Sequence, residues 1–328
     1  MKKKLIISFV IIFILLLTYI ASFFKSTDKR KAINTSLLNT KYLPLINELE
    51  LSQGDKAIQI VKKNGIWFLN DVGGSIPVEE KRVDDFLKEL SKTRTAYKIA
   101  GKAKGTGGTG GIGGAEKLAS YGLTDGTELV LRYYFDEPQG RNVEPGRDSG
   151  NFYELIFGNH DFSGTSRFFM TGKAATVYEI DSSLDKYLST SPQSWYDPYI
   201  VSKSIQKKLS YKDIQRIKVD FEGKTSILTT KTEAFAEKTS KLLDLRHGGL
   251  VEYESLSSPQ MTIALEKGDT SQIIITIYQT EKDSEYNVEV EHSDAFGSGG
   301  IGSDKAGAIK VRTKISLWTY NKIKEIML

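Results

Sequence analysis

The sequence predicts an α+β protein, in which an N-terminal transmembrane helix precedes two similar modules, each an antiparallel sheet with packed helices. Three observations support this fold class. A long uncharged run lies near the N-terminus, short apolar runs alternate with turn residues from residue 45 onward, and the same order of strands and helices recurs after residue 200. The predicted boundaries are a cytoplasmic tip at 1–4, the transmembrane helix at 5–24, a polar connector at 25–44, and modules at 45–200 and 201–328.

Residues 5–24, LIISFVIIFILLLTYIASFF, form the uncharged run. A helix rises about 1.5 Å per residue, so a run of this length matches a hydrocarbon core of about 30 Å. The basic flanks at 2–4 and 25–31 are nearly balanced. The N-terminal flank is short and easily retained, which favours an N-terminus on the inside and a body outside the cytoplasm. We therefore expect a single-pass protein of a bacterial cytoplasmic membrane, which contacts lipid through 5–24. A cleaved signal peptide is the alternative. It is disfavoured by the length of the run and by Tyr19, which lies two residues before Ala21 where processing needs a small residue.

The composition excludes several kinds of chemistry and partner. The chain has no cysteine, so disulfides, thiolate metal sites, cysteine nucleophiles and a lipoprotein anchor are excluded. Its 45 Lys and Arg exceed its 41 Asp and Glu only slightly, and the lysines at 2–4 account for most of the excess. Because the body is close to neutral, we expect no nucleic-acid partner.

The first module begins with a hairpin pattern. Alternating apolar residues within 46–51, 58–61 and 66–69, separated by turn residues, predict two or three antiparallel strands. Apolar residues at helical spacing then predict a helix over 79–92. The remaining predicted elements are strands over 128–135, 152–157, 166–170 and 176–180 and a short closing helix over 182–188.

The second module repeats this order of elements at low residue identity. A strand over 211–221 and its hairpin partner over 225–230 are followed by a helix over 232–245. The remaining predicted elements are strands over 260–265, 273–278, 286–291 and 309–313 and a terminal helix over 316–326.

Two glycine-rich tracts, 101–114 and 297–302, are predicted to be surface loops. Gly105, Gly107 and Gly110 satisfy the pattern G-x-G-x-x-G of dinucleotide-binding sites. However, no apolar strand precedes this triplet and no helix pattern follows it, and neither tract ends in G-K-[ST]. We therefore predict no cofactor.

The sequence does not indicate an enzyme or a metal site. His160, His247 and His292 are far apart and lack the spacing that places two metal ligands on one helical face. Strand alternation puts Glu289 and Glu291 opposite His292, which predicts that His292 is a solvated strand end. No G-x-S-x-G motif occurs, and we predict no catalytic residues.

The large aromatic residues are predicted to pack between sheets and helices, because they lie within or beside apolar patterns. The residues in question are Trp67, Tyr121, Tyr178, Trp195 and Trp318. A second possibility is open for Trp195 together with Tyr196 and Tyr199, which lie where the two modules join. These three residues form either a ligand-binding cluster or an interdomain contact with a buried Trp195.

Taken together, several motifs resemble the domain-of-unknown-function family 4340. They are the hairpin Asn64–Leu69, the helix Val78–Lys92, the sequence Leu118-Ala-Ser-Tyr121-Gly122-Leu123, and the strands Leu155–Gly158 and Thr176–Ile180. The residues that carry the motifs are Trp67, Tyr121, Gly122, Leu123, Gly158 and Tyr178. The resemblance covers most of the chain after the apolar run, and the inserts at 101–114 and 136–150 depart from it.

This resemblance implies an envelope protein similar to the auxiliary proteins of ABC-type or gliding-motility transporters, and it carries no catalytic residues. We therefore expect a membrane-anchored, extracytoplasmic and non-enzymatic interaction protein. Its expected partner is an ABC-type permease or a sibling accessory protein. The alternatives are an envelope hydrolase acting on glycan or peptide, and a small-ligand receptor that uses the junction near Trp195.

Overall fold

The computed structural model describes residues 32–71, 74–100, 118–124, 126–135, 152–171, 176–209, 213–251, 257–268, 270–282, 284–292 and 309–328. The predicted transmembrane helix at 5–24, both glycine tracts and the insert at 136–150 lie outside these residues. Within them, no helix is both long enough and apolar enough to cross a membrane.

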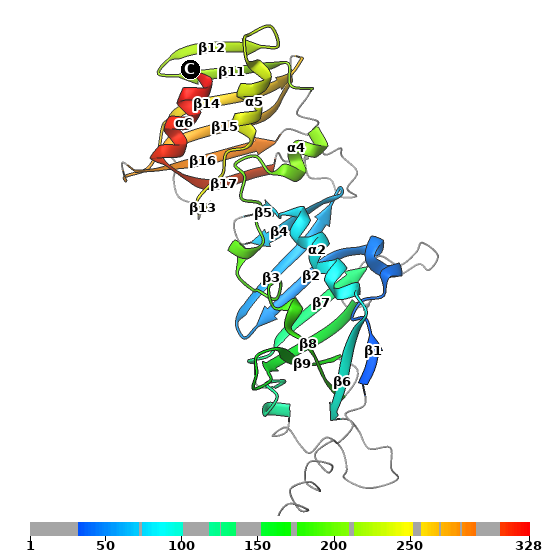
Figure 1. The fold of residues 1–328 in the computed structure, drawn as a ribbon. Helices are drawn as coiled ribbons and strands as arrows, with labels where there is room; N and C mark the ends of the chain where they lie inside the picture. The colour runs from blue at the N-terminus through cyan, green and yellow to red at the C-terminus, as the bar shows by residue number, and fades with distance from the viewer. Residues whose placement is uncertain are drawn as a thin grey trace, which may run out of the picture. The chain divides into compact units, whose positions relative to one another are not determined.

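Strands dominate the described residues, which form two large antiparallel sheets (Figure 1). The predicted α+β class is therefore wrong, and the protein is mostly β. The prediction gave helices too much weight: 182–188 holds only the 3-10 turn η2 (Ser182–Leu184). It also missed β1 (Ala32–Thr35) and β6 (Arg94–Ala100). These short strands carry little apolar alternation of their own and are specified by pairing with neighbours.

The first sheet contains ten strands in the order β1-β6-β10-β9-β8-β7-β2-β3-β4-β5. The strands not yet delimited are β10 (Val177–Asp181), β9 (Ser166–Thr171), β8 (Phe152–His160), β7 (Leu129–Phe135), β2 (Ile46–Gln53), β3 (Lys56–Lys63), β4 (Ile66–Asp71) and β5 (Gly74–Pro77). The predicted hairpin and the strands predicted between 128 and 180 are thus confirmed.

The second sheet contains seven strands in the order β12-β11-β14-β15-β16-β17-β13. They are β11 (Arg216–Phe221), β12 (Lys224–Thr229), β13 (Gly249–Leu250), β14 (Pro259–Lys267), β15 (Thr270–Gln279), β16 (Glu285–His292) and β17 (Ile309–Ser316). The seven strands β6-β10-β9-β8-β7-β2-β3 of the first sheet follow the same order along the chain, read from the opposite end. The first sheet differs by its three additional strands β1, β4 and β5, so the sheets are unequal in size.

Helices α5 (Phe235–Leu243) and α6 (Leu317–Met327) contact each other and cover one face of the second sheet (Figure 1). Alternate residues of the strands, such as Ile273, Ile275 and Ile277 of β15, point into this core. Tyr320 of α6 stacks on Tyr286 of β16 with ring centroids 4.0 Å apart. Both helices were predicted and are confirmed.

By its internal contacts the chain divides into two compact units. Unit 1 comprises Met1–Leu37, Thr93–Glu128 and Leu155–Ser182, and unit 2 comprises Leu38–Lys92, Leu129–Glu154 and Ser183–Leu328. The division predicted at residue 200 stays a prediction.

In unit 2, β4 is buried on both faces. Trp67 and Leu69 lie on one face, and α2 (Glu80–Ser91), the confirmed first helix, contacts this strand. Ile66 and Phe68 point to the other face and pack with Ile205 of α4 (Lys203–Leu209). The sequence did not predict α4, because its lysine-rich sequence offers only a narrow apolar stripe.

In unit 1, the sequence Leu118–Leu123 forms a turn that lies against β8. The backbone N–H of Asn159 donates to the carbonyl of Tyr121 at 2.8 Å. A Cβ added to Gly158 would lie 2.1 Å from that carbonyl oxygen, and one added to Gly122, whose φ is +67°, would lie 2.5 Å from the Asn159 side chain. These glycines therefore allow the turn and the strand to approach closely.

Gly158→Ala is expected to lower the free energy of unfolding by about 2 kcal/mol, because the new methyl group would collide with backbone rather than with a flexible side chain. The midpoint of denaturant unfolding, followed by circular dichroism, measures this loss. Gly248→Ala is the control, since a Cβ there meets its nearest atom at an ordinary 3.6 Å. Equal midpoints for the two variants would show that the turn does not dock on β8 as described.

The prediction that His292 is a solvated strand end is wrong, because the residue is buried. Its side chain is only 2% exposed, because it shares a strand face with Val288 and Val290, which α5 and α6 cover. Burial lowers the pKa of His292 to about 4, as a charged imidazole is poorly solvated there.

The burial of His292 predicts loss of stability in acid. Above its unfolded-state pKa, near 6.5, the group is neutral in both states, whereas between pH 6.5 and 4 the unfolded chain binds a proton that the folded chain does not. Lowering the pH from 7 to 5 is therefore expected to decrease the free energy of unfolding by about 2 kcal/mol through His292. Urea titrations of the parent and of His292→Leu at both pH values measure it, with His160→Gln, an exposed position, as control. An identical pH dependence in all three proteins would refute this assignment.

Candidate functional site

The predicted cluster Trp195, Tyr196 and Tyr199 follows the 3-10 turn η3 (Pro192–Ser194) in unit 2. Trp195 is completely buried. Its Nε1–H donates to the carbonyl of Ser189 at 2.8 Å, and its ring packs edge-on against Phe86 of α2 at 5.7 Å. The indole thus fills the core and presents no face on which a ligand could stack.

A guanidinium group completes the surroundings of Trp195. The guanidinium carbon of Arg82 lies 4.9 Å from the Trp195 ring centroid and 5.6 Å from that of Tyr187. Arg82 also donates from Nη2 to the carbonyl of Lys186 at 2.7 Å. Cation–π contact on two rings and a hydrogen bond to the backbone hold this side chain in place.

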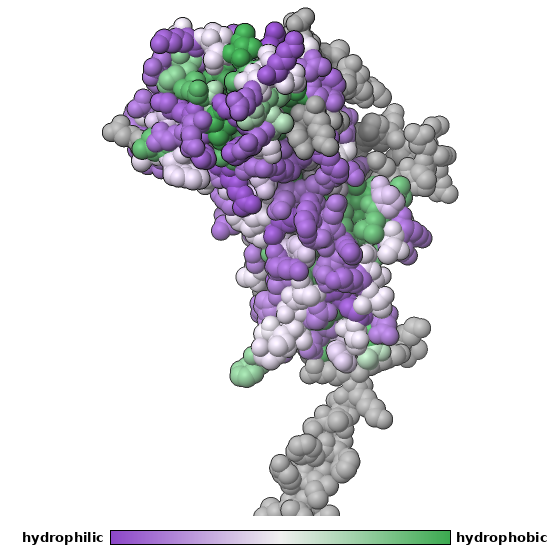
Figure 2. Space-filling view, turned by 45° about the horizontal axis from the view of Figure 1, so that its top comes forward, coloured by the Kyte–Doolittle hydropathy of each residue, from purple (hydrophilic) through white to green (hydrophobic). Residues whose placement is uncertain are grey.

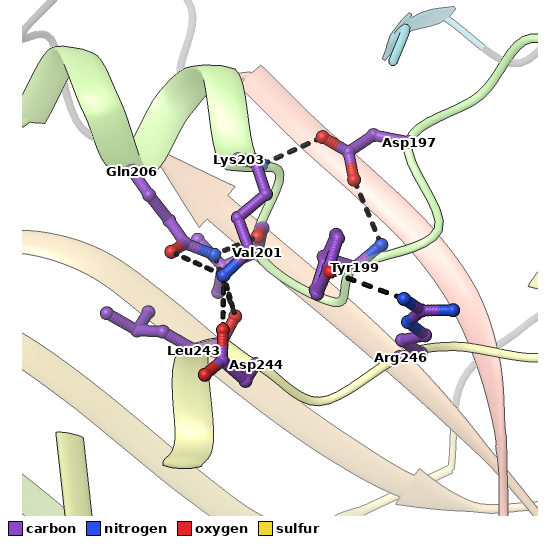
Figure 3. A network of polar contacts seen from close by, with 8 residues as sticks. All are labelled: Asp197, Tyr199, Val201, Lys203, Gln206, Leu243, Asp244 and Arg246. Atoms are coloured by element: carbon purple, nitrogen blue, oxygen red, sulfur yellow. Dashed lines mark hydrogen bonds and ion pairs between the residues drawn. The ribbon is translucent and has the colours of Figure 1, made fainter. Parts of the chain in front are cut away.

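Asp197 organises the segment that follows. Its buried carboxylate accepts hydrogen bonds from the N–H of Tyr199 at 3.0 Å and the N–H of Lys203 at 2.8 Å (Figure 3). It also accepts a hydrogen bond from the hydroxyl of Ser202 at 2.9 Å. Burial raises the pKa of Asp197, while these three donors act in the opposite direction. Because Lys203 is the first residue of α4, the carboxylate satisfies one of the backbone N–H groups that have no partner within the helix.

His247 touches the same segment through the backbone. Its Nε2 lies 2.8 Å from the carbonyl oxygen of Asp197, and its ring lies 5.1 Å from that of Tyr196. Burial lowers the pKa of His247, and the Asp197 carbonyl opposes this shift. The imidazole contacts the Asp197 carbonyl and not its carboxylate. The nearby hydroxyl of Ser202 is also buried, so this His, Asp and Ser do not form a catalytic triad.

A second set of polar contacts ties α4 to the end of α5. Gln206 donates from Nε2 to the carbonyls of Val201 at 2.6 Å and Leu243 at 2.7 Å, and Lys203 forms an ion pair with Asp244 (Figure 3). The Lys203 ammonium also lies 4.3 Å from the Tyr199 ring centroid.

Arg246 approaches the Tyr199 ring from a separate segment, with its guanidinium carbon 5.2 Å from the centroid. Its Nη2 lies 3.4 Å from the Tyr199 hydroxyl (Figure 3). Tyr199 bonds directly to Asp197, and Tyr196 reaches it through His247, whereas Trp195 packs in the core against Phe86 and Arg82. Asp197 and His247 were missed by the sequence analysis. The Asp197-Pro198 dipeptide, which favours a turn, was the available signal.

The structure brings most of the family-motif residues together in unit 1. Tyr121 packs on Phe168 with centroids 4.9 Å apart, and Leu123 is buried. Tyr178 stacks on Phe169 at 5.5 Å. Gly122, Leu123 and Gly158 lie where the turn meets β8, the rings of Tyr121 and Tyr178 pack on β9, and Trp67 lies in unit 2. The motif is thus used for packing.

Among the residues that the structure describes, no three His, Asp or Glu side chains are grouped as metal ligands. A family model described as "Domain of unknown function (DUF4340)" matches residues 67–289. Neither a curated protein nor a solved structure matches the chain.

Proposed function

The chain belongs to the DUF4340 family, and from this premise we propose that it acts by binding another protein of the cell envelope, as a membrane-tethered accessory subunit of an ABC-type transporter. The family description names no activity, and the support for a binding role comes from the surface of this chain.

One observation carries the proposal: large aromatic side chains are held in the open by ordered elements. Phe162, in the turn between β8 and β9, has a relative exposure of 109%, and Trp318, near the start of α6, is 71% exposed. Aromatic residues are enriched at protein–protein interfaces, and a few residues, Trp prominent among them, dominate the binding energy. Figure 2 shows a mainly hydrophilic face with hydrophobic residues in small areas, which favours binding through a few anchors.

The sequence supplies the reason for a membrane location. The apolar segment 5–24 with its basic flanks would hold the body beside a permease, and anionic lipid attracts such flanks. Tethering raises the effective concentration of the two proteins, so a weak interface can still be well occupied. In this proposal the body lies outside the cytoplasm.

Crosslinking in native membranes, followed by gentle detergent extraction, tests the proposal. An ABC-type permease or a sibling accessory protein should be recovered with the full chain. Replacing 1–24 by a cleavable secretion signal should reduce this recovery while leaving the body folded. If no partner is recovered and the purified body instead hydrolyses a glycan or peptide, the enzyme alternative replaces the proposal.

A further inference from the structure

The turn between β8 and β9 places an apolar ring fully in water. Phe162 has a relative exposure of 109%, the highest of any large hydrophobic residue that the structure describes. Other exposed aromatic residues are partly covered: Tyr153 stacks on Tyr133 at 5.6 Å and Phe152 packs on Tyr134 at 5.5 Å.

Hydrogen bonds fix this turn. The N–H of Asp161 donates to the carbonyl of Ser166 at 2.9 Å, and the N–H of Gly164 donates to the carbonyl of Asp161 at 3.1 Å. The Asp161 carboxylate accepts from the N–H of Ser166 at 3.0 Å and from the hydroxyl of Ser163 at 2.6 Å. Gly164 has the positive φ, +72°, that the turn requires. Phe162 itself has no part in these contacts, so turn chemistry does not explain a phenylalanine here.

We propose that Phe162 is the anchor by which the chain binds its protein partner, inserting into an apolar pocket on that partner. This inference rests on the proposed function and names its contact surface. A turn already held in one conformation loses little entropy on binding, and burying the exposed ring then contributes directly to affinity.

The charges beside Phe162 favour a protein pocket over a lipid bilayer. Hydrogen bonds from Ser163 and Ser166 lower the pKa of Asp161, so a carboxylate stands next to the ring. The turn 161–165 contains no lysine or arginine, and Arg167, at the base of β9, donates to the carbonyl of Gly158 at 2.9 Å. Membrane insertion would desolvate Asp161 near anionic lipid, whereas a pocket edged by a basic side chain would complement it.

Site-specific photocrosslinking in the full chain tests the contact. A benzophenone amino acid replaces Phe162, Phe152 or Trp318 in native membranes, and mass spectrometry identifies the adducts. We expect a protein adduct from position 162, mapped to residues that line an apolar pocket of the partner, and little from position 152.

Binding measurements on the identified partner complete the test. Phe162→Ala should raise Kd about tenfold or more, Phe162→Leu should retain most of the affinity, and Phe152→Ala should leave it unchanged. Thermal unfolding of Phe162→Ala should match the parent, because the ring packs on nothing within the described residues.

The outcomes separate this inference from the proposed function. Partner adducts only from positions 152 or 318, or an unchanged Kd for Phe162→Ala, would overturn the anchor while leaving the binding function intact. Lipid adducts from position 162 would assign the residue to the bilayer and also overturn it. The absence of any protein adduct and of any recovered partner would remove both.

Discussion

Trp195→Ala is expected to lower the free energy of unfolding by about 3–5 kcal/mol, because removing a completely buried indole loses its transfer energy and leaves a cavity. The change also leaves the carbonyl of Ser189 without its indole donor and removes the aromatic contact with Phe86. Denaturant unfolding followed by circular dichroism measures the loss.

Trp195→Phe is the matched variant. It keeps an aromatic ring beside Phe86 but removes the Nε1–H, so a smaller loss of about 1–2 kcal/mol is expected. If Trp195→Ala left the unfolding midpoint in place and instead abolished binding of a small ligand, Trp195 would belong to a binding site and the buried position described here would be wrong.

Trp67→Ala is expected to cost a similar amount, about 3–5 kcal/mol. The side chain is 2% exposed on the face of β4 opposite Ile66 and Phe68, and the Lys62 ammonium lies 5.4 Å from its ring centroid. A cavity on this face would weaken a strand whose other face packs on α4.

Trp318→Ala is the control, since it removes the same side chain from a position that is 71% exposed. Its expected effect on the unfolding free energy is below about 0.5 kcal/mol. Comparing Trp67→Ala with Trp318→Ala therefore separates the effect of burial from the effect of removing an indole. Comparable losses in both variants would show that Trp318 is covered in solution.

Trp318 also shows where the sequence analysis reached its limit. It was predicted to pack inside, yet the apolar side of α6 consists of Tyr320, Ile323, Ile326 and Met327. Trp318 lies two residues before Tyr320 and so on the opposite side of the helix, about 200° away. The helix was predictable from its periodicity, and Ser316 caps it, with its Oγ accepting the N–H of Thr319 at 3.2 Å. The side that faces the sheet is the one that packs on it, where Tyr320 stacks on Tyr286 of β16.

The candidate site was predicted in part. Tyr196 and Tyr199 were singled out with Trp195 because they are aromatic and adjacent in sequence, and the structure does place them around one segment. The residue that organises them is Asp197, together with His247 from fifty residues further along the chain. Nothing local marks that pairing, because a hydrogen bond to a backbone carbonyl imposes no sequence pattern on its acceptor.

The sequence by itself determined the strands of the first hairpin, strands β7 to β10 and β14 to β17, and helices α2, α5 and α6. Local alternation and helical spacing decide which residues can share a face. The tertiary structure decided the mostly β class, the burial of His292 and the meeting of Gly158 with the turn at Tyr121. Strands β1 and β6 form because they pair with strands distant in sequence. The covering helices decide which face of a strand is buried. The turn at Tyr121 can approach Gly158 closely because glycine has no side chain. No local sequence pattern predicts these three features, because each depends on residues distant in sequence.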